Sequence, residues 1–327
     1  MYKNGGSLMR KLMVVLLVVL GSVSMIYSQA QQENAKKELR WGSVHTPEQP
    51  VTSIIMKGAI EEINAKATGI HISAFPNSTL GNSSELVEGV KEGIVDIITE
   101  GPAQFQAWVP KAAQVEAPYL WKDVDHMQRA LNGKYKEVLN KLFEASDVKI
   151  IGTFYYGTRQ LTTNKPVYTL KDLSGMKIRV PAAALYVKMV ESWGAAATPM
   201  ALGELYLALQ QGVVDGQENP LPTFNAQKFY EVIKYVIKTN HIICPNMVFM
   251  NLKAWNAMSK HDQEVVQEAV DKAIAKFNTQ NLQEEKTLSE TLKQYNVKII
   301  EPDNTIKEAT VPYIKPYIED WDYIQTL

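Results

Sequence analysis

The sequence has almost no cysteine. Cys244 is the only one among the 327 residues, so no disulfide can form within the chain and no cysteine cluster can hold a metal ion. It lies in an apolar run, which favours a small buried side chain rather than a nucleophile. The hydrophobic core must therefore supply the stability without covalent cross-links.

Common motifs of catalysis and nucleotide binding are also absent. The chain contains no G-x-G-x-x-G, no P-loop, no H-E-x-x-H and no G-x-S-x-G. With 34 Lys and Arg against 35 Asp and Glu, it has no basic surplus that would indicate nucleic acid. We expect no cofactor and no enzyme activity. One enzymatic alternative stays open, a secreted glycoside hydrolase that uses Glu100 and Glu218 as its carboxylate pair.

Residues 1–30 differ from the rest of the chain. Three positive residues precede an apolar run over residues 12–26, and Ser28 and Ala30 provide the small residues of a cleavage site. This pattern is typical of a secretory signal peptide. A membrane anchor is the alternative, but a membrane span needs about 20 apolar residues. We therefore expect cleavage near residue 30 and a periplasmic mature protein.

Alternating strand and helix patterns predict an α/β fold. The first part reads as strand, helix, strand, helix, strand over Leu39–Ser43, Ile54–Ala67, Ile70–Phe75, Ser84–Glu92 and Val95–Ile98. The alternation resumes later, with strands predicted at Lys149–Thr153, Met176–Val180 and Val213–Asp215 and helices at Ala183–Trp193 and Leu202–Gln211. Two α/β lobes are the expected result.

A long helical pattern follows in the last third of the chain. Ser259 and Asp262 form a plausible N-terminal cap, and apolar residues at helical spacing continue from Val266 to Leu292. One helix of this length could brace two lobes. Two shorter helices, broken near Asn278–Asn281, are an equal alternative.

Two arginines stand out as candidate ligand contacts. Arg179 ends a short apolar strand before Pro181, and ligands of open α/β sheets bind beyond the carboxyl ends of strands. Its guanidinium could make two parallel hydrogen bonds to a carboxylate. Arg159 lies in a polar segment next to Tyr156, which could stack on a ligand ring. For both arginines a structural salt bridge is the alternative.

Further candidates lie in loops or after strands. Glu100 and Gln104 follow a predicted strand, and Asn219 follows a later one. An amide such as that of Asn219 both donates and accepts, which suits the hydroxyl groups of a polyol. His45 and Gln49 lie in the first strand-to-helix loop, a usual place for ligand contacts.

Several segments occur together and in order. GTRQLTTN, GMKIRVP, ATPMALGELYLALQQGVVDGQENPL and AQKFYEV span residues 157–232. They closely resemble the substrate-binding proteins of tripartite ATP-independent periplasmic (TRAP) transporters, the DctP-like family. The resemblance extends to FPNSTLGNSSELVEGVKEGIVDI and EAPYLWKD, and covers essentially the whole mature chain.

The resemblance implies a two-lobed periplasmic-binding-protein fold, type II-like, with a ligand cleft between the lobes and a long helix spanning both. The expected lobes are 31–156 plus about 245–284, and 157–244 plus about 285–327. Such a protein binds a small organic acid and delivers it to a small and a large integral membrane subunit. We expect a monomer and identify no metal-binding residues.

The resemblance also implies roles for individual residues. Arg179 would pair with the ligand carboxylate, Arg159 would assist it, and Asn219 and Glu100 would line the cleft. The matched sequence segments most resemble those of the sialate-binding branch of the family. The chain departs from that branch at three positions that contact the large acid, which here are Gln104, Ala182 and Leu202.

These departures favour a smaller ligand than sialate. A hexuronate such as glucuronate or galacturonate is the expected ligand. Sialate, a dicarboxylate or a keto acid remain alternatives. A ligand-sensing module for a receptor is the alternative of another functional class.

Overall fold

The computed structural model describes residues 36–327, and the predicted signal peptide at residues 1–30 lies outside them. The first lobe is built around three parallel strands, β1 (Lys37–Ser43), β2 (Ile70–Phe75) and β3 (Ile97–Glu100). A π-helical turn at Val51–Met56 leads into α2 (Lys57–Lys66), and α3 (Ser83–Glu92) precedes β3. The predicted opening of alternating strands and helices is confirmed.

The second lobe is built around β5 (Lys177–Val180), β6 (Ala196–Pro199) and β7 (Gly216–Pro220), which are also mutually parallel. Its helices are α6 (Ala184–Ser192), α7 (Leu205–Gln210) and α8 (Leu221–Ala226). The strand predicted at Val213–Asp215 is wrong in position. Those residues form the turn before β7, and the strand itself is the buried but polar sequence GQENP, which an apolar pattern does not reveal.

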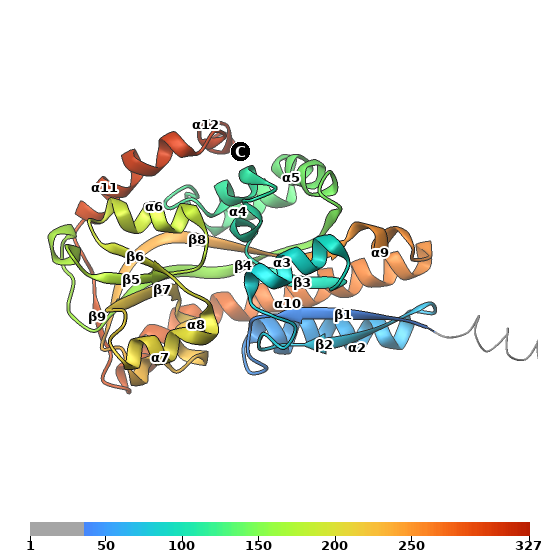
Figure 1. Cartoon of the computed structure of the whole chain (residues 1–327), viewed down its shortest axis with the longest axis horizontal. Helices are drawn as coiled ribbons and strands as arrows, with labels where there is room; N and C mark the ends of the chain where they lie inside the picture. Colours follow the sequence, from blue (N-terminus) through green and yellow to red (C-terminus); the bar gives the residue numbers. More distant parts are fainter. Residues whose placement is uncertain (1–35) are drawn as a thin grey trace, which may run out of the picture.

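Two long antiparallel strands, β4 (Val148–Thr163) and β8 (Tyr235–Asn251), connect the lobes. The sheet order is β2-β1-β3-β8-β4-β7-β5-β6, with β9 (Lys298–Ile300) added to β8. Each long strand therefore belongs to both lobes, with the short parallel strands on either side (Figure 1). The two-lobed α/β fold is as predicted, although the strand expected at Lys149–Thr153 is only the beginning of β4.

One unbroken helix, α10 (Lys260–Lys293, 34 residues), runs beneath both lobes (Figure 1). The Ser259 side chain caps it as predicted, accepting a hydrogen bond from the Asp262 amide at 3.0 Å. The alternative of two helices is wrong. Asn278 and Asn281 face β4, where they hydrogen-bond the Tyr155 backbone at 3.1 Å. The β4–β8 register shifts at Tyr155, and the two asparagines satisfy backbone groups there.

The far end of α10 packs in the second lobe. Leu288 and Leu292 lie in a hydrophobic cluster with Leu205, Phe224 and Phe229, separate from the larger cluster that fills most of the core. Earlier residues of α10 lie in the larger cluster, so buried apolar side chains anchor the helix near both of its ends.

The C-terminal segment also contacts both lobes. It contains α11 (Thr305–Ile314), which packs on α6, and α12 (Trp321–Ile324). Near α12, Tyr135 Oη donates to Asp320 at 2.9 Å, and His126 Nε2 lies 3.0 Å from the Ile324 carbonyl oxygen. Those two partners belong to α5 (Lys134–Glu144) and α4 (Val124–Asn132).

One short helix, α9 (Leu252–Asn256), links β8 to α10. None of the helices in residues 36–327 combines the length and apolar character that crossing a bilayer requires.

The contact between α10 and β4 gives a test of the lobe connection. A Cβ at Gly152 would overlap Ile274 Cδ1 and lie 2.8 Å from Val270 Cγ1, so in Gly152→Ala either these side chains or the helix must shift. We expect it to destabilise the protein by about 1–3 kcal/mol. Gly58→Ala in α2 is the matched control, because a Cβ there meets nothing within 4 Å.

Gly58→Ala should stabilise the protein by about 0.5–1 kcal/mol, since it removes a flexible residue from a helix. Both variants are measured by urea unfolding. Equal effects of the two substitutions would contradict the close packing of α10 on β4.

Candidate functional site

A small pocket of about 60 Å³ lies between the two lobes. Seven of the eight predicted site residues line it, namely Arg179, Arg159, Asn219, Glu100, His45, Gln104 and Tyr156. The pocket is placed where β3, β4, β7 and β8 run next to one another in the sheet, with β5 beyond β7. Residues up to 202 positions apart in the chain, Val44 and Asn246 (246 − 44), therefore meet in one cavity.

Arg179 projects from β5 and is 3% exposed. Its Nε and Nη2 atoms donate to the Met200 carbonyl oxygen at 3.0 and 2.7 Å. Among residues 36–327, no carboxylate lies within 4 Å of this guanidinium. Burial lowers the pKa of Arg179 to about 10. The side chain thus stays charged at neutral pH while it lacks a counter-ion, and the alternative of a structural salt bridge does not apply to it.

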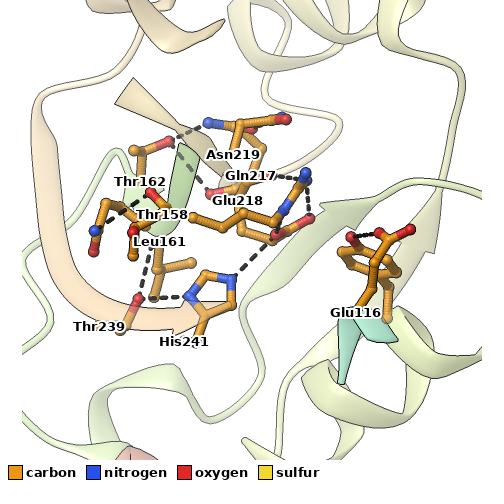
Figure 2. Close-up of polar contacts among 12 residues, drawn as sticks. Glu116, Thr158, Leu161, Thr162, Gln217, Glu218, Asn219, Thr239 and His241 are labelled. Carbon is orange, nitrogen blue, oxygen red and sulfur yellow. Dashed lines mark hydrogen bonds and ion pairs between the residues drawn. The ribbon is translucent and has the colours of Figure 1, made fainter. Parts of the chain in front are cut away.

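Arg159 has the opposite environment. Its Nη2 atom donates to Glu218 Oε1 and to the Glu218 backbone oxygen, each at 2.8 Å, and its Nε atom donates to Glu218 Oε2 (Figure 2). Burial alone would lower the pKa of Arg159, but the Glu218 carboxylate outweighs burial and raises it well above its ordinary value. Arg159 therefore forms the buried structural salt bridge that was the predicted alternative to a ligand contact.

Strand pairing explains this ion pair. Glu218 of β7 lies opposite Leu161 of β4, so Arg159, two residues away on β4, is its diagonal neighbour. His241 Nε2 lies 3.1 Å from Glu218 Oε2, and Thr239 Oγ1 lies 2.7 Å from His241 Nδ1 (Figure 2). Although burial raises the pKa of Glu218, Arg159 and His241 reverse that effect and lower it. Glu218 is therefore a fully bonded, ionised carboxylate.

Glu100 ends β3 and is 7% exposed. Its Oε1 atom accepts from the Gly101 amide at 3.0 Å, whereas its buried Oε2 atom has no hydrogen-bond partner of good geometry among residues 36–327. Burial raises the pKa of Glu100 to about 7. The Ser83 hydroxyl is close enough only to lower the pKa of the Glu100 carboxyl slightly against the effect of burial. An unpartnered buried oxygen is unfavourable, and here it belongs to a residue that lines the cavity.

Glu116 and Tyr186 complete the wall, and sequence reasoning did not single them out. Glu116 Oε1 accepts from the Ala103 amide at 2.7 Å, and its Oε2 atom accepts from the Tyr186 hydroxyl. The guanidinium carbon of Arg159 lies 5.0 Å from the centroid of the Tyr186 ring. Tyr186 comes from α6 of the second lobe, so this hydrogen bond crosses the cleft. The segment EAPYLWKD, which carried the resemblance, was the available signal for Glu116.

His45 and Tyr156 form a neutral hydrogen-bonding wall. His45 Nδ1 lies 2.8 Å from Ser43 Oγ, and its Nε2 lies 3.2 Å from the Tyr156 hydroxyl, which in turn lies 2.5 Å from Thr223 Oγ1. Burial lowers the pKa of His45 to about 4, so the ring is neutral at physiological pH. Asn219 donates to Gln217 Oε1 at 2.6 Å, which leaves its own side-chain oxygen for a ligand.

Gln49 does not line the pocket. Its Oε1 atom accepts from the Thr46 amide at 2.7 Å and from Gln227 Nε2 at 3.4 Å. Its side chain therefore stabilises its own loop and contacts the second lobe, and it does not reach the cavity. Nothing in its sequence position separates it from His45, because only the local turn decides which side chain points inward.

The arrangement suits binding of an anion with hydroxyl groups. A free cation, one free carboxylate oxygen and several neutral polar groups meet in an enclosed space. Glu218 is engaged by Arg159 and His241, so Glu100 and Glu218 are not the free carboxylate pair of a glycoside hydrolase. Within the described chain no group of three or more His, Cys, Asp or Glu side chains is placed to hold a metal ion.

Comparisons with known proteins agree with this geometry. The family model DctP, bacterial extracellular solute-binding protein, family 7, matches residues 42–323. The sialic acid-binding periplasmic protein SiaP of Vibrio cholerae is 34% identical over 251 residues, which is 76% of this chain and 78% of SiaP.

Solved structures of similar proteins carry sugar acids. A TRAP periplasmic solute-binding protein of Roseobacter denitrificans with bound L-galactonate superimposes with a TM-score of 0.84 at 29% identity, covering 89% of this chain and 99% of that one. A TRAP protein of Sulfitobacter sp. NAS-14.1 with bound β-D-galacturonate gives 0.83 at 29% identity, covering 89% and 97%. These proteins are binding proteins and not enzymes. Because the family model covers nearly the whole described chain, the protein belongs to the DctP family of bacterial extracellular solute-binding proteins.

Proposed function

We propose that this protein captures a sugar acid of hexuronate or hexonate size for a TRAP transporter, with Arg179 binding the carboxylate. The observation that carries this proposal is the buried Arg179 guanidinium, which has no acidic partner in residues 36–327 and opens onto the pocket between the lobes. A buried charge without a counter-ion is costly. A ligand carboxylate would supply the missing charge and accept two parallel hydrogen bonds.

Arg159 has a secondary role in this proposal. Glu218 already engages its Nε and Nη2 atoms, so Arg159 contributes chiefly its Nη1 donors to the pocket. The hydroxyl groups of the acid would be bound by neutral or acidic groups of the wall, namely Asn219, Glu100, Gln104, His45 and Tyr156.

Similar proteins support the choice of ligand. Besides the galactonate and galacturonate complexes, a similar protein of Chromohalobacter salexigens carries D-glucuronate at a TM-score of 0.82 and 26% identity. The 2,3-diketo-L-gulonate-binding protein YiaO of Escherichia coli is 27% identical over 71% of this chain. All these ligands are six-carbon acids.

We further propose that the protein works as a periplasmic monomer beside two integral membrane subunits, after removal of residues 1–30. The proposed lobes are 31–156 plus about 245–284, and 157–244 plus about 285–327. The mass of the exported protein tests the cleavage, since a mass that includes residues 1–30 would contradict it.

The proposed function is tested with a panel of acids. Ligand present above its dissociation constant must raise the melting temperature, because it binds only the folded state. We expect uronates and aldonates to raise it more than sialate, simple dicarboxylates or keto acids. An unchanged melting temperature with every acid would contradict the proposal.

The role of Arg179 is tested with the acid that binds best. Arg179→Met keeps the length of the side chain but removes its charge, and we expect at least about 30-fold weaker binding by calorimetry, since losing one partner of a buried charge pair costs about 2–5 kcal/mol. Arg179→Lys should also bind poorly because a lysine cannot form the two parallel bonds.

Lys177→Met, in the same strand but exposed, is the matched control and should bind normally. The melting temperature of ligand-free Arg179→Met should equal or exceed that of the wild type, since it removes an unpaired buried charge. Normal affinity in Arg179→Met would exclude Arg179 as the carboxylate ligand.

The buried Glu100 should also make the stability of the ligand-free protein depend on pH. Burial raises the pKa of Glu100 from the ordinary 4.5 to about 7, so its contribution to stability is complete below about pH 4.5 and is lost as pH rises through 7. Between pH 4.5 and 8 this loss is about 3 kcal/mol. Glu100→Gln cannot ionise and should lose correspondingly less in ligand-free urea unfolding. Equal losses in both proteins would contradict the raised pKa.

A further inference from the structure

We infer that Glu100 makes the pocket selective for acids with a single carboxylate and excludes acids with a second one. This inference rests on the proposed function and names the class of acid that the same site accepts. It follows from the hydrogen bonds and charges of the side chains that surround the cavity.

Three buried glutamates lie in or beside the pocket, and two of them have no oxygen left for a ligand. Glu218 is bonded through both carboxylate oxygens to Arg159 and through one of them to His241. Glu116 is bonded through one oxygen to the Ala103 amide and through the other to Tyr186. Only Glu100 keeps a buried oxygen, Oε2, that no residue of the described chain satisfies.

The two arginines of the pocket also differ in whether they have a partner. Glu218 offsets the charge of Arg159, so Arg179 is the one cation at the pocket without a carboxylate partner among residues 36–327. One ligand carboxylate would neutralise Arg179. A second ligand carboxylate would find no further free cation in the cavity.

A second carboxylate would instead share the cavity with Glu100. Two like charges placed together in a buried site repel each other strongly, because little water is present to screen them. A ligand hydroxyl is different, since it can donate a hydrogen bond to Oε2 and satisfy the unpartnered oxygen. Three further polar side chains that line the pocket, Ser83, Gln104 and Asn246, are neutral and cannot offset a second negative charge.

Two acids that differ only at one end provide the test. L-galactonate and galactarate are both open-chain six-carbon acids, and the terminal hydroxymethyl group of the first is a carboxylate in the second. We expect the wild type to bind galactarate at least about tenfold more weakly than L-galactonate by calorimetry at pH 8, where Glu100 is largely ionised. In Glu100→Gln, which keeps the shape of the side chain, the difference should shrink to about threefold or less.

Glu88→Gln is the matched control, because Glu88 is an exposed carboxylate of α3 that does not line the pocket. It should leave the ratio of the two affinities near the wild-type value, whatever it does to each affinity alone. Circular dichroism melts of each variant serve as the control for folding.

Each outcome decides the inference. Comparable wild-type affinities for the two acids, or a preference for galactarate, would overturn it while leaving capture of an acid intact. A preference for L-galactonate that survives in Glu100→Gln would also overturn it. Binding of neither acid by the wild type would refute the inference, and the acid panel would then show separately whether the proposed function fails too.

Discussion

The pairing of β4 with β8 is the constraint on which the rest of the molecule depends. The two strands run through both lobes, and the strands that carry the pocket are aligned to them. Glu100 lies opposite Met247 of β8 at the end of β3, and Glu218 lies opposite Leu161 of β4 in β7. Because these registers are fixed by backbone hydrogen bonds, the polar side chains reach the cavity from defined positions.

Within that frame, the buried polar groups differ in how fully they are satisfied. Glu218 neutralises Arg159 and contacts His241, so this cluster is a stable internal part of the sheet. Arg179 and Glu100, which both line the cavity, instead remain incompletely paired among the described residues. Natural proteins retain such unfavourable groups mainly where function requires them. The distinction between the two arginines is therefore the clearest sign of what the pocket binds.

Much of this arrangement could be predicted from the sequence, for identifiable reasons. Apolar periodicity located the short strands and the long helix, and the position of Arg179 at a strand end suggested an anion contact. Periodicity could not reveal β7, whose residues are buried yet polar, nor decide that Asn278 and Asn281 would bond to β4 instead of ending the helix. The two asparagines bond to a strand more than a hundred residues away, and β7 pairs with β4 at separations of 53 to 61 residues (216 − 163 and 220 − 159).

Partners distant in the sequence also decided which residues of the pocket are free to bind a ligand. From their positions alone, both arginines were equally plausible as ligand contacts or as salt-bridge partners, and only the strand register places Glu218 beside Arg159. Glu116 meets Tyr186 across 70 residues of sequence (186 − 116), so neither residue could indicate the other. Gln49 and His45 share one loop, yet only His45 lines the cavity.

The C-terminal segment has a mechanical consequence. Besides the strand pair and α10, it forms a third connection between the lobes, with α11 on α6 and α12 held near Tyr135 and His126. These three connections lie at separate places in the molecule, so together they restrict twisting and sliding of one lobe against the other. The orientation of the lobes around the pocket is therefore determined by more than the strand pair alone.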